Sequence, residues 1–129
     1  MKKRILLVDD EEVIIKTVGT RLEMEGYEVL VAVDGDEALE KANAERPDLI
    51  ILDLMLPKKN GHQVCALLKR ESSARKIPVV ICTARASQKD EQASYECGAD
   101  AYIRKPFQTR ELLDTIRRLI ARPAAFPPG

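Results

Sequence analysis

Five polar residues of this sequence stand where a short apolar run ends, and together they could carry out chemistry. They are Asp9, Asp10, Asp53, Thr83 and Lys105. The two adjacent acids follow the first apolar run of the chain, and the others follow the third, fourth and fifth. If these runs are parallel strands, their carboxyl ends meet at one edge of a sheet, where ligands bind in such folds. We therefore expect three carboxylates, a hydroxyl and an ammonium group in one pocket.

This set of groups is suited to phosphoryl transfer. Three neighbouring carboxylates repel one another, and Mg²⁺ would relieve the repulsion because it prefers carboxylate, water and phosphate oxygens. Together with Lys105, Mg²⁺ would stabilise negative charge on a transferring phosphoryl group, to which Thr83 could donate a hydrogen bond. Asp53 stands alone after its apolar run, and a carboxylate that attacks phosphorus forms an acyl phosphate. We predict that Asp53 is the nucleophile.

Each of these residues also has a simpler interpretation. An acidic pair before a helix can cap it and complement its dipole. Asp53 could begin a turn ahead of Pro57, and Lys105 could be a solvated loop residue before Pro106. Because all of them fall at the same edge of one predicted sheet, the joint interpretation as a site is favoured.

The elements that position these residues alternate between strand and helix. Five runs rich in Val, Ile and Leu predict strands: Arg4–Val8, Glu28–Val33, Asp48–Leu52, Pro78–Cys82 and Asp100–Arg104. The segments between them have helical periodicity. Strict alternation implies parallel strands joined by right-handed crossovers, and continuous apolar runs imply that both faces of the sheet are covered. We predict a doubly wound α/β domain.

Several residues mark the predicted helices. Gly26 is expected to end the first helix, and Asp36, the last residue of an Asp-Gly-Asp turn, can cap the second. The segment Gln88–Cys97 is different, because it offers few apolar positions, namely Ala93, Tyr95 and Cys97. A helix docked by so few contacts is either a solvated surface helix or a part that moves, and the sequence leaves both open.

Composition excludes several classes of protein. The 129 residues include 21 Lys and Arg against 21 Asp and Glu, a formal charge of zero, which argues against a general electrostatic binder of nucleic acid or membrane. The apolar stretch after Lys2, Lys3 and Arg4 is four residues long and is followed by acids, unlike a signal peptide. No apolar stretch is long enough to span a membrane. We therefore expect a cytoplasmic protein.

The cysteines and the single histidine are not expected to form a site. Cys65, Cys82 and Cys97 are odd in number and widely spaced, which predicts reduced, apolar thiols rather than disulfides or a zinc site. His62 is expected to be exposed or partly packed rather than a phosphodonor.

Four stretches of the chain resemble the receiver domain of bacterial two-component response regulators, the CheY-like superfamily. They are Arg4-Ile-Leu-Leu-Val-Asp-Asp-Glu11, Pro47-Asp-Leu-Ile-Ile-Leu-Asp-Leu-Met-Leu-Pro57 with Asn60-Gly61, Pro78-Val-Val-Ile-Cys-Thr-Ala84, and Gly98-Ala-Asp-Ala-Tyr-Ile-Arg-Lys-Pro-Phe107. The resemblance covers residues 2–121 as one receiver domain, and residues 122–129 form a Pro-rich tail or the start of a linker. It implies a flavodoxin-like sheet of order 2-1-3-4-5 with five helices on both faces.

The resemblance also implies roles for individual residues. Asp53 would be phosphorylated, and Thr83 and Lys105 would contact the phosphoryl group. Mg²⁺ would be held by Asp10, Asp53 and the backbone carbonyl of Met55, with Asp9 acting through water.

Other roles implied by the resemblance concern switching. Tyr102 would be a switch aromatic that turns inward as Thr83 moves toward the phosphoryl group, and the Lys105–Pro106 peptide bond would be cis. Met55 and Arg85 would flank the site and tune the lifetime of the acyl phosphate. The surface of the fourth helix, fifth strand and fifth helix would rearrange.

The resemblance implies a signalling switch, not an enzyme in the usual sense, with intrinsic self-phosphorylation and self-dephosphorylation chemistry. Its partner would be a sensor histidine kinase or a histidine phosphotransfer protein, and its output is open. A phosphorylation-dependent homodimer is a further partner arrangement left open. Winged-helix members of the family dimerise through charged residues, but here Ala101 and Thr115 stand where an acid and a base are expected, although Glu111 remains.

Three other functions fit parts of the sequence. A haloacid dehalogenase-type hydrolase would need a second Asp two residues after the nucleophile, where this chain has Met55. A nucleotide or flavin binder would need a Gly-x-Gly-x-x-Gly motif after the first strand, which is missing. A receiver-like interaction domain that is never phosphorylated stays open, although every pocket residue is present.

Overall fold

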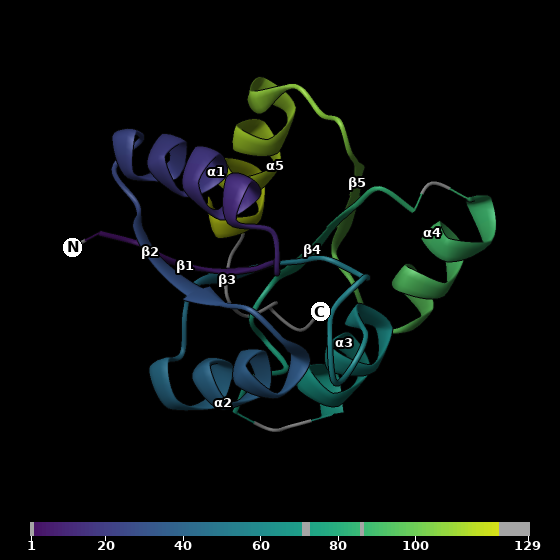
Figure 1. Cartoon of the computed structure of the whole chain (residues 1–129). Helices are drawn as coiled ribbons and strands as arrows, with labels where there is room; N and C mark the ends of the chain where they lie inside the picture. Colours follow the sequence, from purple (N-terminus) through teal and green to yellow (C-terminus); the bar gives the residue numbers. More distant parts are fainter. Residues whose placement is uncertain (1, 71–72, 86, 122–129) are drawn as a thin grey trace, which may run out of the picture.

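The computed structural model describes residues 2–70, 73–85 and 87–121, which form alternating strands and helices (Figure 1). The strands of this described part are β1 (Arg4–Val8), β2 (Glu28–Ala32), β3 (Leu49–Leu52), β4 (Val79–Thr83) and β5 (Ala101–Arg104). Its helices are α1 (Glu12–Met24), α2 (Gly35–Glu45), α3 (Gly61–Arg70), α4 (Gln88–Glu96) and α5 (Thr109–Ala121). The predicted Pro-rich tail, residues 122–129, lies outside the described residues.

The strands form one parallel sheet in the order β2-β1-β3-β4-β5, which confirms the predicted doubly wound α/β fold. The register aligns the ends of the central strands. Val8 at the end of β1 pairs with Leu52 at the end of β3, so the residues that follow them emerge side by side. Farther along the sheet, Thr83 at the end of β4 pairs with Arg104 at the end of β5, directly before Lys105. The sheet therefore presents four candidate residues along one edge.

Helices cover both faces of the sheet. Figure 1 shows α1 and α5 on one side and α2 and α3 on the other. Successive side chains of a strand point to opposite faces. Accordingly, Leu6 and Val8 pack in the core beneath α2 and α3, and Ile5 and Leu7 pack in the core beneath α1 and α5. Burial of both faces explains why the strands are continuously apolar.

Local residues explain where α1 ends and where α2 begins. Gly26 follows α1 with a φ of +96°, a conformation that favours glycine, which confirms the predicted stop. The predicted cap of α2 was wrong by two residues. Asp34, not Asp36, caps the helix, because its extended backbone lets its carboxylate accept a hydrogen bond of 2.8 Å from the Glu37 N–H.

Helix α4 is sparsely packed, as predicted, but the residue that it buries is unexpected. Tyr95 is 47% exposed, and Ala93 and Cys97 are only half-buried. Within α4, all of whose residues are described, Ser94 is the buried one. The helix therefore docks through a polar side chain rather than through the apolar positions that its sequence suggests.

In the described part of the chain, no helix combines the length and the apolar character needed to cross a lipid bilayer.

A close backbone approach joins α3 to the end of β3. The N–H of Gly61, the first residue of α3, donates to the carbonyl of Leu54 at 2.9 Å. A Cβ atom built on Gly61 would lie 2.4 Å from the carbonyl oxygen of Asp53. Since the obstacle is backbone and not a flexible side chain, only glycine fits here without moving the residue at the end of β3.

Replacing Gly61 with alanine should therefore destabilise the protein by roughly 1–3 kcal/mol, as overpacking commonly does. The matched control is Gly19→Ala in α1, where the added Cβ would make contacts of 3.9 Å or longer. There the better helix propensity of alanine should leave stability unchanged or raised by up to about 1 kcal/mol. Chemical denaturation measures both variants, and equal stabilities would contradict the steric argument.

Candidate functional site

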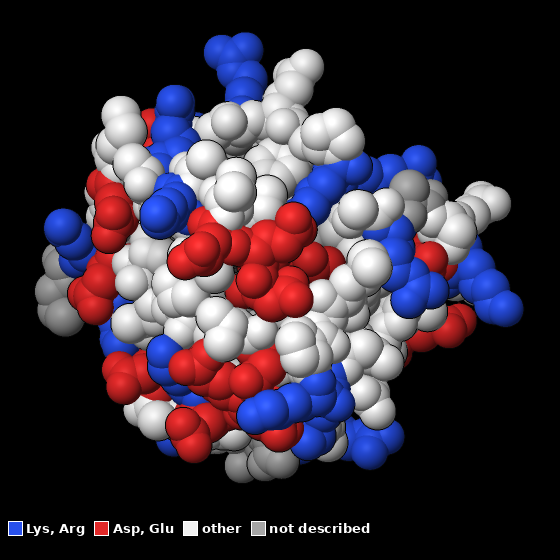
Figure 2. Space-filling view, in the orientation of Figure 1, with Lys and Arg blue, Asp and Glu red and all other residues white. Residues whose placement is uncertain are grey.

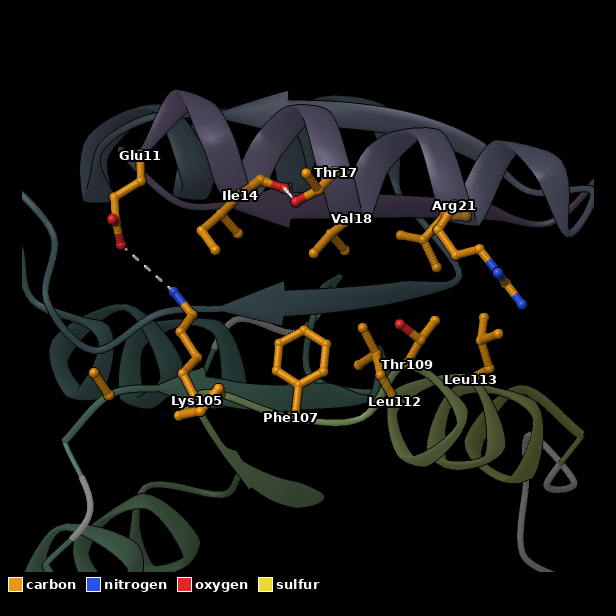
Figure 3. A pocket seen from close by; sticks show the side chains of 13 residues that line it. Glu11, Ile14, Thr17, Val18, Arg21, Lys105, Phe107, Thr109, Leu112 and Leu113 are labelled. Carbon is orange, nitrogen blue, oxygen red and sulfur yellow. Dashed lines mark hydrogen bonds and ion pairs between the residues drawn. The ribbon is translucent and has the colours of Figure 1, made fainter.

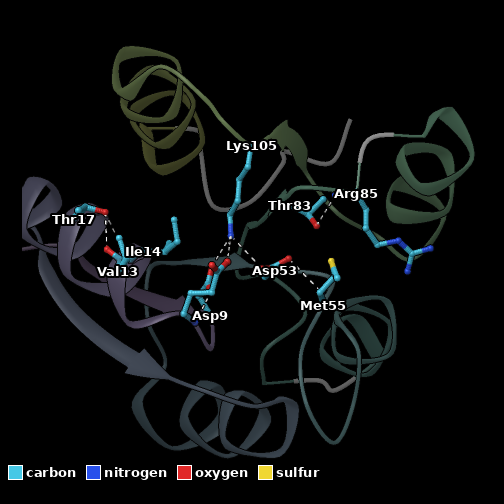
Figure 4. A network of polar contacts seen from close by, with 10 residues as sticks. Asp9, Val13, Ile14, Thr17, Asp53, Met55, Thr83, Arg85 and Lys105 are labelled. Atoms are coloured by element: carbon cyan, nitrogen blue, oxygen red, sulfur yellow. Dashed lines mark hydrogen bonds and ion pairs between the residues drawn. The ribbon is translucent and has the colours of Figure 1, made fainter.

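The ends of four strands bring four of the predicted residues together (Figure 4). Asp9 follows β1, Asp53 follows β3, Thr83 ends β4 and Lys105 follows β5. Asp9 and Asp53 are 2% and 5% exposed, and Thr83 is fully buried. Buried carboxylates are costly unless they are paired, so their partners decide whether the arrangement is stable.

Lys105 is the shared partner of the two buried acids. Its Nζ donates to Oδ2 of Asp9 at 2.7 Å and to Oδ2 of Asp53 at 3.1 Å. Burial lowers the pKa of this ammonium group, but its hydrogen bond to Asp9 and the charge of Asp53 outweigh burial and hold the pKa above its ordinary value. Lys105 therefore stays charged and neutralises much of the pocket.

The second oxygen of each acid accepts a hydrogen bond from the backbone. The N–H of Glu11 donates to Oδ1 of Asp9 at 2.9 Å, and the N–H of Met55 donates to Oδ1 of Asp53 at 3.1 Å. Both carboxylates are thus held in orientation, with one oxygen of each directed at the same ammonium group.

The third acid of the cluster is Glu11 and not Asp10. One carboxylate oxygen from each of Asp9, Glu11 and Asp53 lies within 4.8 Å of the others. Glu11 also lies 3.9 Å from Nζ of Lys105. Asp10 is exposed and outside this group. Sequence reasoning missed Glu11, although its place directly after the acidic pair was the available signal.

Thr83 is connected to the predicted switch residue through Arg85. The N–H of Arg85 donates to Oγ1 of Thr83 at 3.2 Å, and its carbonyl accepts a hydrogen bond from the hydroxyl of Tyr102. The Arg85 side chain forms an ion pair of 3.0 Å with Asp90 in the first turn of α4. One residue therefore contacts Thr83, Tyr102 and α4.

The remaining predicted residues lie around the pocket. Met55 is 56% exposed beside the site, as a flanking residue would be. The Lys105–Pro106 peptide bond is cis, the geometry that the resemblance implied.

Cys82, directly before Thr83, is not a competing nucleophile. Burial raises the pKa of its thiol to about 12, so the thiolate is scarce at neutral pH. Cys65 and Cys97 are also free thiols, and burial raises their pKa values as well.

The surface charge is uneven although the net charge is zero. Figure 2 shows acidic side chains gathered near the middle of the face where the strands end, with basic side chains toward α4. A local excess of carboxylate oxygens is what a divalent cation needs.

A pocket of about 480 Å³ opens beside the site, between α1 and the segment from β5 to α5 (Figure 3). Its walls are mainly apolar, and the pair formed by Glu11 and Lys105 lies at one end. Lys105 therefore borders this pocket as well as the two buried acids.

The family model and the related sequences point to the same family. The family model of the response regulator receiver domain matches residues 5–117. The alkaline phosphatase synthesis transcriptional regulatory protein PhoP of Bacillus subtilis is 42% identical over all of this chain and 53% of that protein. The phosphate regulon transcriptional regulatory protein PhoB of Escherichia coli is 45% identical over 95% of this chain and 53% of that protein. The chain spans about half the length of these relatives.

Solved structures agree with the sequence relatives. The receiver domain of sensor histidine kinase PA1611 from Pseudomonas aeruginosa has a TM-score of 0.88 at 30% identity, covering 95% of this chain and all of that one. That receiver domain was solved with a magnesium ion coordinated in its active site cleft. Sequence, fold and the acidic site thus lead to one conclusion: the chain belongs to the response regulator receiver domain family, the phosphorylation-activated switch of two-component signalling.

Proposed function

We propose that Asp53 accepts a phosphoryl group from the phosphohistidine of a sensor histidine kinase or a histidine phosphotransfer protein. The observation that carries the proposal is the shared ion pair at the strand ends. Oδ2 of Asp53 lies next to both an ammonium group and a second carboxylate, in a pocket closed to bulk water on most sides. Asp53 is thus a nucleophile beside a fixed positive charge.

The transfer conserves atoms and electrons. A carboxylate oxygen of Asp53 forms a bond to phosphorus, the phosphorus–nitrogen bond breaks, and its electron pair stays on the imidazole of the donor. The same attack on a small acyl phosphate would break its phosphorus–oxygen bond, release the donor's carboxylate and give self-phosphorylation. In self-dephosphorylation, water attacks phosphorus, inorganic phosphate leaves and the Asp53 carboxylate is regenerated. Positioning and electrostatics supply most of the catalysis in such transfers.

The acidic cluster fits Mg²⁺. The residues proposed to hold the ion are Asp9, Asp10, Asp53 and the carbonyl of Met55. Of these, Asp9 and Asp53 belong to the cluster that also contains Glu11, whereas Asp10 is exposed beside it. Their chemistry supports the proposal because all supply oxygens, and two of the carboxylates are buried with one ammonium group as their shared counter-charge. A bound Mg²⁺ would neutralise charge that develops on the phosphoryl oxygens.

The other residues are proposed to act around the phosphoryl group. The ammonium group of Lys105 would donate to a phosphoryl oxygen in place of the Asp53 carboxylate. The hydroxyl of Thr83 would donate to another phosphoryl oxygen. Since Arg85 joins Thr83 to Tyr102 through its backbone, movement of Thr83 would reach Tyr102 and the surface of α4, β5 and α5. Met55 and Arg85 would set how quickly water reaches phosphorus.

We also propose where the domain acts and what it controls. Residues 2–121 would act as one receiver unit in the cytoplasm, and the effector would be a further domain or a separate protein. The relatives named as transcriptional regulatory proteins favour transcription as the controlled process. A phosphorylation-dependent homodimer stays a prediction.

Replacing Asp53 with asparagine should abolish labelling by radioactive acetyl phosphate in the presence of Mg²⁺, because an uncharged amide replaces the nucleophilic carboxylate. The matched control is Asp114→Asn, which changes an exposed acid of α5 in the same way. The control should be labelled as strongly as the parent chain. If Asp53→Asn were labelled equally well, the assigned acceptor would be wrong.

Replacing Lys105 with methionine should destabilise the protein by roughly 2–4 kcal/mol, because two buried carboxylates lose their shared partner. Mg²⁺ should then raise the melting temperature of Lys105→Met more than that of the parent, since Lys105 no longer competes for the same oxygens. Scanning calorimetry with and without Mg²⁺ measures both effects. The control Lys16→Met removes an exposed lysine of α1 and should behave like the parent. An equal response to Mg²⁺ in all three proteins would contradict the proposed ion site.

A further inference from the structure

Helix α4 is held to the rest of the domain at a polar point. Its buried side chain is Ser94, which is fully enclosed, and α3 lies beside it (Figure 1). Nε2 of His62, in the first turn of α3, lies 2.9 Å from Oγ of Ser94. This contact joins residues 32 positions apart in the sequence.

The direction of this hydrogen bond follows from the partners of the serine. Oγ of Ser94 donates to the carbonyl of Asp90, one turn earlier in α4, at 2.9 Å. A serine hydroxyl has one hydrogen, so the assignment that satisfies both contacts places that hydrogen on the carbonyl of Asp90 and a ring hydrogen on Nε2 of His62. His62 therefore donates its Nε2–H to Ser94, and one ring hydrogen joins α3 to the buried side of α4.

The ion pair of 3.0 Å between Arg85 and Asp90 ties the first turn of α4 to the loop that leads into it, and the Arg85 side chain is half-exposed. The other described polar contacts of α4 with the domain are weaker. The ion pair between Arg104 and Glu91 spans 3.6 Å with both side chains at least one-third exposed, and such pairs contribute little. Near the end of α4, Sγ of Cys65 lies 3.5 Å from the carbonyl of Cys97, and a thiol is a weak donor. The short bond from His62 is thus the best-placed polar contact between the two helices.

We propose that His62 is a positioning residue, whose hydrogen bond to Ser94 holds α4 in its unphosphorylated position and opposes the rearrangement of the α4 surface. The proposal rests on the proposed function, in which phosphorylation of Asp53 shifts that surface. A bond made in one arrangement and broken in the other shifts the equilibrium between them by its own free energy. A neutral hydrogen bond corresponds to about 2- to 10-fold in such an equilibrium.

The test measures the affinity of the protein for beryllofluoride, a phosphoryl mimic, with Mg²⁺ by isothermal titration calorimetry. Removing the bond by His62→Ala or by Ser94→Ala should lower the Kd for beryllofluoride about 2- to 10-fold, because α4 can then move without breaking the hydrogen bond. The double variant should match either single variant, since both remove the same bond.

Two control variants separate this role from a general loss of packing. His62→Gln keeps an N–H donor at a similar reach and should restore the parent Kd. Gln92→Ala changes an exposed residue of α4 that interacts with Glu96 in the same helix, and it should leave the Kd unchanged. A Kd that is unchanged or higher in both His62→Ala and Ser94→Ala would overturn the proposal.

Hydrogen exchange of the α4 amides in the unphosphorylated protein provides a measurement that does not depend on phosphoryl chemistry. Exchange should be faster in His62→Ala and Ser94→Ala than in the parent, His62→Gln and Gln92→Ala. If the parent bound no beryllofluoride, the proposed function would fail, and exchange alone would decide on the His62 bond. Equal exchange in all five proteins would overturn the bond as a restraint on α4.

Discussion

The arrangement of this domain depends on one buried interaction, the ammonium group of Lys105 held between Asp9 and Asp53. Two carboxylates that are nearly inaccessible to water would be strongly destabilising without it. The Lys105 side chain is itself 11% exposed, so all three charges depend on their mutual geometry. A site built in this way responds to new charge, because a cation or a phosphoryl group that enters must change the partners of Lys105. The interaction that stabilises the resting pocket is therefore also the one that a signal would alter.

The fold supplies that geometry through strand register and close backbone contacts. Because Val8 pairs with Leu52, the acids that follow them emerge together at one edge of the sheet. Gly61 lets α3 begin against the carbonyl of Asp53, so the start of a helix packs directly on the backbone of Asp53. On the other side, Arg85 links Thr83 with Tyr102 and α4. The site is therefore backed by a close backbone contact on one side and by a polar, sparsely packed helix on the other.

Much of this could be predicted from the sequence, because strand ends and helix periodicity are local signals. Asp9, Asp53, Thr83 and Lys105 meet because each comes directly at the end of a strand. Side-chain direction was harder to predict: Glu11, rather than its neighbour Asp10, turns toward the cluster, and Asp34 rather than Asp36 caps α2. The role of Ser94 could not be predicted, since the partner that makes burial of a serine favourable is His62, 32 residues away. Such pairs depend on tertiary packing, and no periodicity of α4 encodes them.

The central claim is that the phosphoryl group is covalently bound to the carboxylate that shares Lys105 with Asp9. The most direct measurement treats the protein with acetyl phosphate and Mg²⁺, reduces it with borohydride and locates the modified residue by peptide mass spectrometry. Borohydride converts an aspartyl phosphate to homoserine. The account predicts homoserine at position 53 and unmodified aspartate at positions 9 and 10. Homoserine at another position, or a stable phosphate on a side chain other than a carboxylate, would contradict it.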